Sequence, residues 1–135
     1  MNRKILTVIL LVLAALTAVG SVTFLGPCVH ADGSEAPCAA AGRAVLADGI
    51  VLAVLALLLL VVKAPKARTA LFILAAFTAL VGILLPGTLF PICKMDTMHC
   101  RMVMRPAMII LFAVSLLVSV CGLAADKAGR RKGRK

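Results

Sequence analysis

The chain has no tryptophan, no tyrosine and only five acidic residues among its 135 positions. Tryptophan and tyrosine form the aromatic belts of membrane proteins, so no such belt marks a lipid boundary here. Only 15% of the residues are charged, whereas 63% are hydrophobic. Soluble domains contain about 45–50% apolar residues. This composition excludes an ordinary soluble domain and indicates an integral membrane protein.

Four long apolar runs divide the chain, and Asp48 is the one charged residue inside them. A membrane-spanning helix needs about 20 mostly apolar residues, and about 17 can suffice. The first run is longer than the roughly 7–15 apolar residues of a signal peptide, so we expect it to be retained. Lipid gives the backbone no hydrogen-bond partner, so helices are the expected spanning form. The predicted fold is an all-α membrane domain over residues 1–125, with spans at about 5–25, 44–62, 69–85 and 107–125.

The positive charges are unequally divided between the two sides of this four-span topology. One side carries Arg43, Lys94, Arg101 and Arg105, and the other carries the remaining eleven of the fifteen Lys and Arg residues. An excess of Lys and Arg marks the cytoplasmic side, so both termini are predicted to be cytoplasmic in a bacterial inner membrane. This placement around the spans argues against nucleic-acid binding. Residues 126–135 form a basic tail, expected to be disordered, that anchors the topology or attracts anionic lipid.

The two halves of the sequence resemble each other. "LTAVG" at 16–20 resembles "FTALVG" at 77–82, and each half then reaches a cysteine through proline, as "LGPC" and "FPIC". A second cysteine follows in each half, with an arginine five positions further on, in "CAAAGRA" and "CRMVMRPA". Internal similarity of this kind is typical of repeated structural units. We therefore predict two repeated helical hairpins whose cysteine loops face the same outer side.

Four of the five cysteines lie in these two outer loops, as Cys28 with Cys38 and Cys93 with Cys100. The outer side of a bacterial inner membrane is oxidising, so disulfides are expected. Pairing within each loop is favoured, although four cysteines allow three connectivities and cross-loop pairing stays open. Cys121, in the fourth span, is expected to be a small buried apolar residue. The simplest interpretation is that two structural disulfides close these loops and that the cysteines have no catalytic or metal-binding role.

A thiol–quinone oxidoreductase is the alternative interpretation. Arg43 and Arg105 follow the second cysteine of each loop, and a neighbouring cation stabilises a thiolate nucleophile. The four spans, the two outer cysteine pairs and these arginines resemble the bacterial disulfide-bond oxidase family. That resemblance implies a quinone cofactor and a redox role for the four loop cysteines. Here nine and six residues separate the paired cysteines, whereas that family has a Cys-x-x-Cys pair.

A copper site is the third interpretation. The stretch "CKMDTMHCRMVMRP" at 93–106 is rich in soft or borderline ligands suited to Cu(I), and the candidates are Met95, Met98, His99 and Met102. Methionine is also an adaptable filler of packing gaps, and a Cys93–Cys100 disulfide would remove the thiolates. Asp48 is an acidic residue inside a span, which is a functional-site hypothesis by default. We favour instead a structural ion pair of Asp48 with Arg43 or Arg105.

The four-span plan, the repeated cysteine loops and "CKMDTMHC" resemble a family of small bacterial membrane proteins catalogued as domain of unknown function 4418. The family carries no assigned activity. Its members resemble accessory proteins found with ABC-type exporters, which implies a transporter as partner. We therefore expect a non-enzymatic accessory or interaction subunit in the bilayer, with no cofactor, and homo-oligomerisation stays open.

Overall fold

Four long helices make up most of the described chain. The computed structural model describes residues 3–23, 38–85, 88–89 and 100–135. The helices are α1 (Arg3–Val22), α2 (Cys38–Val61), α3 (Pro65–Leu84) and α4 (Arg105–Gly133), and a π-helical turn, η1 (Cys100–Met104), leads into α4. Four helical stretches are long and apolar enough to cross a membrane. They are Lys4–Val22 in α1, Ala40–Val61 in α2, Pro65–Leu84 in α3, and Met102–Gly133, which joins η1 to α4. The prediction of an all-α fold with four helices long and apolar enough to span a membrane is therefore confirmed.

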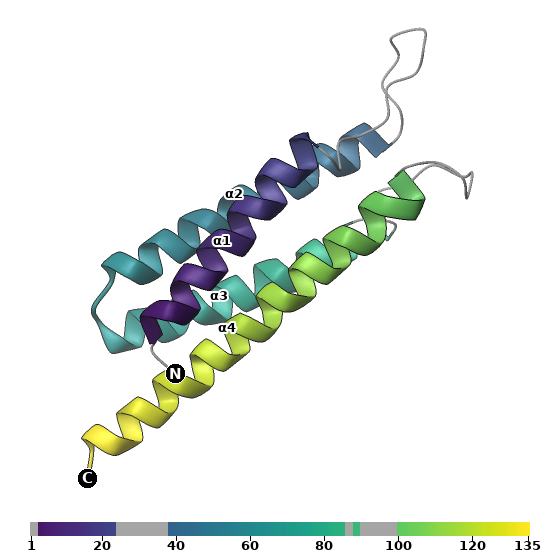
Figure 1. Cartoon of the computed structure of the whole chain (residues 1–135). Helices are drawn as coiled ribbons and strands as arrows, with labels where there is room; N and C mark the ends of the chain where they lie inside the picture. Colours follow the sequence, from purple (N-terminus) through teal and green to yellow (C-terminus); the bar gives the residue numbers. More distant parts are fainter. Residues whose placement is uncertain (1–2, 24–37, 86–87, 90–99) are drawn as a thin grey trace, which may run out of the picture.

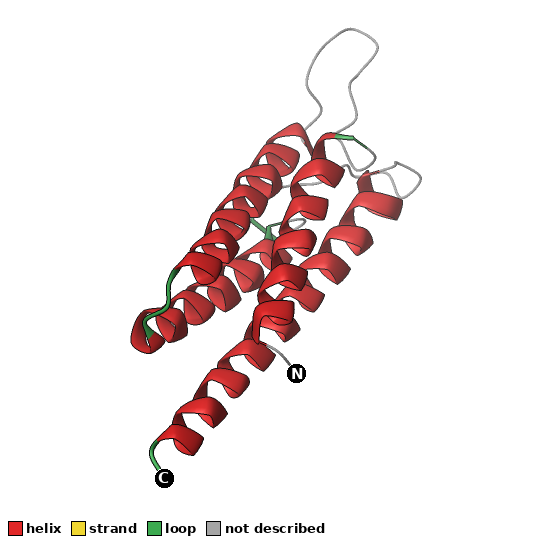
Figure 2. Ribbon diagram, turned by 60° about the vertical axis from the view of Figure 1, so that its left-hand side comes forward, coloured by secondary structure: helices red, strands yellow, loops and turns green. Residues whose placement is uncertain are grey.

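The helices form an elongated bundle in which consecutive helices run in opposite directions (Figures 1 and 2). α1 packs against α2 and α4, and α3 packs against α2 and α4. Both chain termini lie at the end that also carries the short α2–α3 connection (Figure 1). We call this the basic end because it carries Lys4, Lys63, Lys66, Arg68 and the cations of the last turns of α4. The opposite end, where α2 and η1 begin, is called the loop end.

Proline sets the start of two of the helices. Pro65 lies in the first turn of α3, directly after the connection of residues 62–64, and Pro106 lies in the first turn of α4. Proline suits a first turn because its fixed φ is helical and the missing N–H has no partner there anyway. α3 ends at Leu84, and the Leu85 N–H still donates to the Val81 carbonyl at 2.9 Å. Pro86 follows in the sequence, and proline cannot continue a helix ladder.

The helix bounds differ most from the predicted spans at the start of α2 and at the end of α4. α2 begins at Cys38, six residues before the predicted span, and α4 continues to Gly133. The expectation of a disordered tail over 126–135 is therefore wrong. Alanine, lysine and arginine are good helix formers, and the cations Arg130, Arg131 and Lys132 in the last turn favour the negative end of the helix dipole. α4 consequently extends past the other helices at the basic end (Figures 1 and 2).

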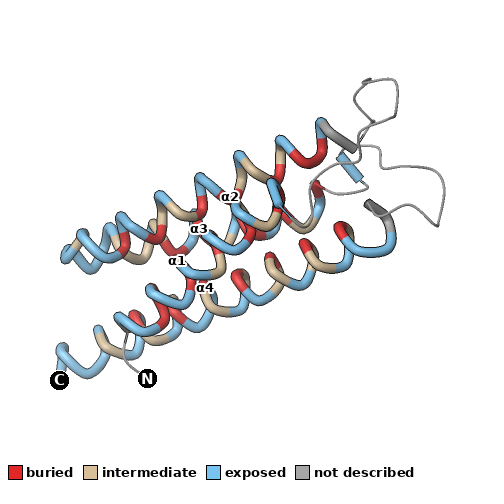
Figure 3. The backbone as a smooth tube through the Cα atoms, turned by 45° about the horizontal axis from the view of Figure 1, so that its top comes forward, coloured by how far each residue is buried: buried red, intermediate tan, exposed pale blue. Residues whose placement is uncertain are grey.

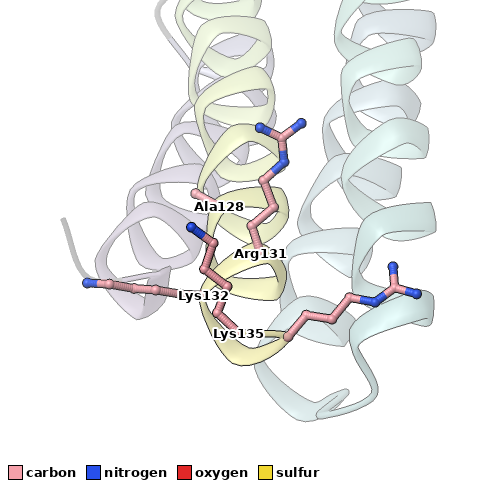
Figure 4. A pocket seen from close by; sticks show the side chains of 5 residues that line it. Ala128, Arg131, Lys132 and Lys135 are labelled. Atoms are coloured by element: carbon pink, nitrogen blue, oxygen red, sulfur yellow. The ribbon is translucent and has the colours of Figure 1, made fainter.

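The buried residues follow the inner face of each helix (Figure 3). Towards the loop end, Phe112 is buried in a cluster with Val45, Leu85, Met104 and Met108. Towards the basic end, Phe72 is buried in a cluster with Leu10, Ala14, Leu52, Ala56, Leu59 and Ala75. The outward faces are also apolar, with Val54, Phe77 and Leu117 each at least half exposed. A surface of this kind is matched to lipid.

Candidate functional site

Asp48 lies inside the bundle, between the two apolar clusters. Its Oδ2 atom is buried and has no hydrogen-bond partner in the described part of the chain. A Cβ atom at Gly82 would lie 2.6 Å from this oxygen and 2.6 Å from Cδ1 and Cε1 of Phe112. α2, α3 and α4 therefore meet at Gly82. A side chain at this position would overlap both the Asp48 carboxyl group and the Phe112 ring.

The predicted ion pair of Asp48 with Arg43 or Arg105 is wrong. Arg43 is exposed in the second turn of α2, and Arg105 is half-buried at the start of α4. The carboxyl group faces Gly82 and Phe112 instead, well inside the bundle. A buried carboxyl oxygen without a hydrogen-bond partner costs free energy, and an acidic residue within a membrane-spanning helix is a functional-site hypothesis by default.

Three buried hydroxyl groups, in contrast, donate hydrogen bonds within their own helices. Thr17 donates to the Ala14 carbonyl at 2.7 Å, Ser115 to the Leu111 carbonyl at 2.9 Å, and Ser119 to the Ser115 carbonyl at 2.8 Å. Thr17 also faces Gly49 of α2, where a Cβ atom would lie 3.1 Å from its Oγ1. Small residues allow helix backbones to approach closely in a membrane. Thr17 is therefore a packing residue of the α1–α2 pair, and Ser115 and Ser119 are small buried residues of α4.

A second polar cluster joins α3 to α4 at the basic end. Asp126 is 1% exposed, and its Oδ2 accepts a hydrogen bond from Thr69 Oγ1 at 2.6 Å. Arg130 lies 3.6 Å from the same oxygen and donates to Thr69 Oγ1 at 2.7 Å and to the Pro65 carbonyl. A buried carboxylate is stable where such donors surround it. The sequence analysis missed this cluster, although the spacing of Asp126 and Arg130 by four residues on a helix was a signal for it.

Two of the cysteine candidates and both arginine candidates lie at the loop end. Cys38 is the first residue of α2 and Cys100 the first of η1, although the structure does not describe their side chains. Cys28 and Cys93 lie outside the described residues. The two predicted disulfides, and the redox role of these cysteines, therefore stay predictions. Arg43 and Arg105 lie in the opening turns of the two helices at this same end.

The methionine-rich stretch divides into exposed and buried residues. Met102 is 66% exposed, whereas Met104 and Met108 are buried in the core as packing residues. Met95, Met98 and His99 lie outside the described residues, so the copper site stays a prediction. Over the described ranges, no three His, Cys, Asp or Glu side chains converge as a metal site would require.

The expectation that Cys121 is buried is wrong, because its side chain is exposed on α4. The inward face of α4 is formed by Phe112, Ser115, Ser119 and Gly122, which recur at three- and four-residue intervals. Position 121 is adjacent to Gly122 and therefore falls outside that stripe. Its thiol faces the surroundings of the bundle.

An all-α bundle of four apolar helices, with polar groups inside it and cations gathered at one end, defines a multi-pass integral membrane protein. The family described as Domain of unknown function (DUF4418) matches residues 10–125, and the chain belongs to this family. The matched region reaches from α1 into α4 and so includes all of α2 and α3. No curated protein and no solved structure matches the chain.

Proposed function

We propose that this protein is a non-enzymatic interaction subunit of a bacterial inner membrane. In this proposal both termini are cytoplasmic, the two outer loops are closed by disulfides, and the bundle associates with a larger membrane protein such as an ABC-type transporter. The orientation rests on the excess of cations at the basic end, because such an excess marks the cytoplasmic side.

The observation that carries this proposal is the filled interior of the bundle. Phe112 packs against Gly82, and Phe72 packs against Gly122, where an added Cβ atom would lie 2.7 Å from Cζ of Phe72. Both rings are 1% exposed or less. Interlocking of this kind resists rearrangement, because closely packed interiors have few alternative arrangements. A rigid, filled bundle is suited to presenting its outer faces and loops to a partner.

Affinity purification from native membranes tests the proposal. We expect one membrane protein to copurify in a fixed ratio with the tagged chain in mild detergent, and to rebind when both are purified separately. Changing Cys28, Cys38, Cys93 and Cys100 to serine should weaken rebinding if the closed loops are part of the contact. Cys121→Ser is the control for loss of a thiol outside the two loops, and it should rebind like the unchanged protein if the loops rather than this face of α4 make the contact. Absence of any partner that rebinds would contradict the proposal.

A thiol–quinone oxidoreductase is the second candidate, and the placement of Cys38 and Cys100 favours it. Both residues begin helical segments at the loop end, and helix N-termini and nearby cations stabilise thiolates. The reaction would transfer two electrons and two protons from a dithiol to a quinone, giving a disulfide and a quinol. Purified protein should then form quinol from a soluble quinone and a dithiol. Cys38→Ser or Cys100→Ser should abolish this turnover, and Cys121→Ser should preserve it.

A Cu(I)-handling protein is the third candidate, supported by the exposure of Met102 at the loop end. A thioether in this position is a suitable soft ligand. The double variant Met98→Leu, His99→Ala should then lose Cu(I) that the unchanged protein retains through gel filtration. Equal retention by both proteins would contradict this candidate.

A further inference from the structure

A cavity of about 390 Å³ lies at the basic end, between the first turns of α1, the end of α2 and the start of α3. Three cations line it, and each comes from a different segment: Lys4 from α1, Lys63 from the α2–α3 connection, and Arg68 from α3. Leu59 and Leu60 of α2 form its apolar wall. The polar clusters of Asp48 and of Asp126 are formed by other residues, so this cavity is a separate feature.

No carboxylate lines this cavity among the described residues. The contributing segments have none to offer, because residues 1–31 and 49–95 contain no aspartate or glutamate. Asp126, the acidic residue of the basic end, is engaged by Thr69 and Arg130. Lys4 and Lys63 are exposed and Arg68 is half-buried. Three like charges around one cavity repel each other, and an anion between them would reduce that repulsion.

Arg68 also supplies a donor that lacks an acceptor. Its Nε atom is buried and has no hydrogen-bond partner in the described part of the chain. Buried N–H donors are almost always paired, so an unpaired one calls for an explanation. The Nε–H and a neighbouring Nη–H form the planar pair of donors that binds two oxygens of a phosphate at once. A phosphate oxygen in the cavity would provide the acceptor that the chain does not.

We propose that this cavity binds a phosphate group, held by Arg68 with Lys4 and Lys63. Basic pockets between membrane helices on the cytoplasmic side are suited to the headgroups of acidic phospholipids. The apolar wall of Leu59 and Leu60 gives room for the attached glycerol and acyl chains, so it favours a lipid as the source of the phosphate. A free phosphate or a soluble phosphate ester has the same anionic chemistry and is the other source.

Binding of defined probes to the purified full-length protein tests the site. Native mass spectrometry in detergent would compare phosphatidylglycerol with phosphatidylcholine, and thermal melting would be followed with and without inorganic phosphate. We expect Arg68→Ala to weaken phosphatidylglycerol binding about tenfold, because it removes both the charge and the paired donors. Lys66→Ala is the matched control, because it removes one charge from an exposed residue in the first turn of α3 that does not line the cavity. It should bind phosphatidylglycerol like the unchanged protein.

Arg68→Lys keeps the positive charge but removes the Nε–H donor. This variant replaces Arg68→Ala in the binding experiment if Arg68→Ala does not fold. We expect Arg68→Lys to bind phosphatidylglycerol more weakly than the unchanged protein but more strongly than Arg68→Ala. Binding by Arg68→Lys as strong as that of the unchanged protein would contradict the role of Nε. Inorganic phosphate could raise the melting temperature of the unchanged protein and of Lys66→Ala but not that of Arg68→Lys. This result would support the site, with free phosphate as its ligand. Equal behaviour of the Arg68 and Lys66 variants with both probes would overturn the proposal.

Discussion

The ring of Phe112 on α4 packs directly against Gly82 on α3, so that a Cβ atom at Gly82 would lie 2.6 Å from two ring carbons. The reverse arrangement occurs nearer the basic end, where Phe72 of α3 packs against Gly122 of α4. The same two helices therefore interlock twice, each supplying one ring and one glycine. Because the rings enter the space left by the absent side chains, the two backbones approach closely. This pair of contacts gives the α3–α4 hairpin a single register.

Gly82→Ala should destabilise the protein. The added Cβ atom would overlap the Phe112 ring and Oδ2 of Asp48, and overpacking of this kind costs about 1–3 kcal/mol. Gly133→Ala is the control, because no atom lies within 4 Å of its added Cβ. Melting in detergent, followed by circular dichroism, should show a lower midpoint for Gly82→Ala only. Equal midpoints would mean that the ring moves aside without cost.

Phe72 and Gly122 should be energetically coupled. Gly122→Ala alone should be destabilising because the ring of Phe72 occupies its space. Phe72→Leu alone should also be destabilising because it leaves a gap in the core cluster, by about 1–3 kcal/mol. In the double variant the smaller side chain leaves room for the new methyl group, so we expect the two effects to be less than additive by about 0.5 kcal/mol or more. A thermodynamic cycle from melting data measures this difference, and strict additivity would contradict the contact.

Asp48 and Asp126 should respond differently to replacement by alanine. Asp126→Ala should cost about 1–3 kcal/mol, because Thr69 and Arg130 lose an acceptor that lies in the protein. Asp48→Ala should change the stability by less than about 1 kcal/mol, because the loss of packing is offset by removing an unpaired carboxyl group. Urea or detergent titration of both variants checks this.

The same Asp48→Ala variant separates function from stability. If Asp48 serves the partner, the variant should rebind that partner more weakly while melting like the unchanged protein. A loss of stability as large as that of Asp126→Ala would instead show that the Asp48 carboxyl group has a stabilising partner.

Thiol alkylation of the native protein should modify one cysteine. Cys121 is exposed and free, so a small lipid-soluble maleimide should reach it. The four loop cysteines should react only after reduction, because the oxidising side of the membrane favours disulfides. Mass spectrometry of intact protein should therefore show one adduct before reduction and five after it. Alkylation of any loop cysteine in native membranes would argue for redox exchange there.

A fluorescent protein fused after Lys135 should fluoresce in bacterial cells, because it folds in the cytoplasm and the basic end is expected there. A periplasmic alkaline phosphatase at the same position should be inactive. Reversed results would place the basic end outside the cytoplasm and would contradict the proposed orientation.

The sequence alone was sufficient to predict four apolar helices and the collection of cations at one end. These features depend on composition, which a single segment carries by itself. The family resemblance was also confirmed, because the family model matches residues 10–125. The continuation of α4 beyond the apolar run also depends on local helix propensity. It was not predicted, because the high charge of the tail was interpreted as a sign of disorder.

Tertiary structure alone decided which faces meet. α2 is apolar on nearly every side, and in a membrane both the lipid-facing and the inward-facing residues are apolar, so periodicity does not reveal its buried face. Asp48 could therefore not be placed against Gly82, and Cys121 could not be assigned to the surface. The cavity around Arg68 likewise depends on three segments that come together only in the folded bundle. Composition determined that this chain enters a membrane, and the packing of its helices decided which polar groups remain inside without a partner.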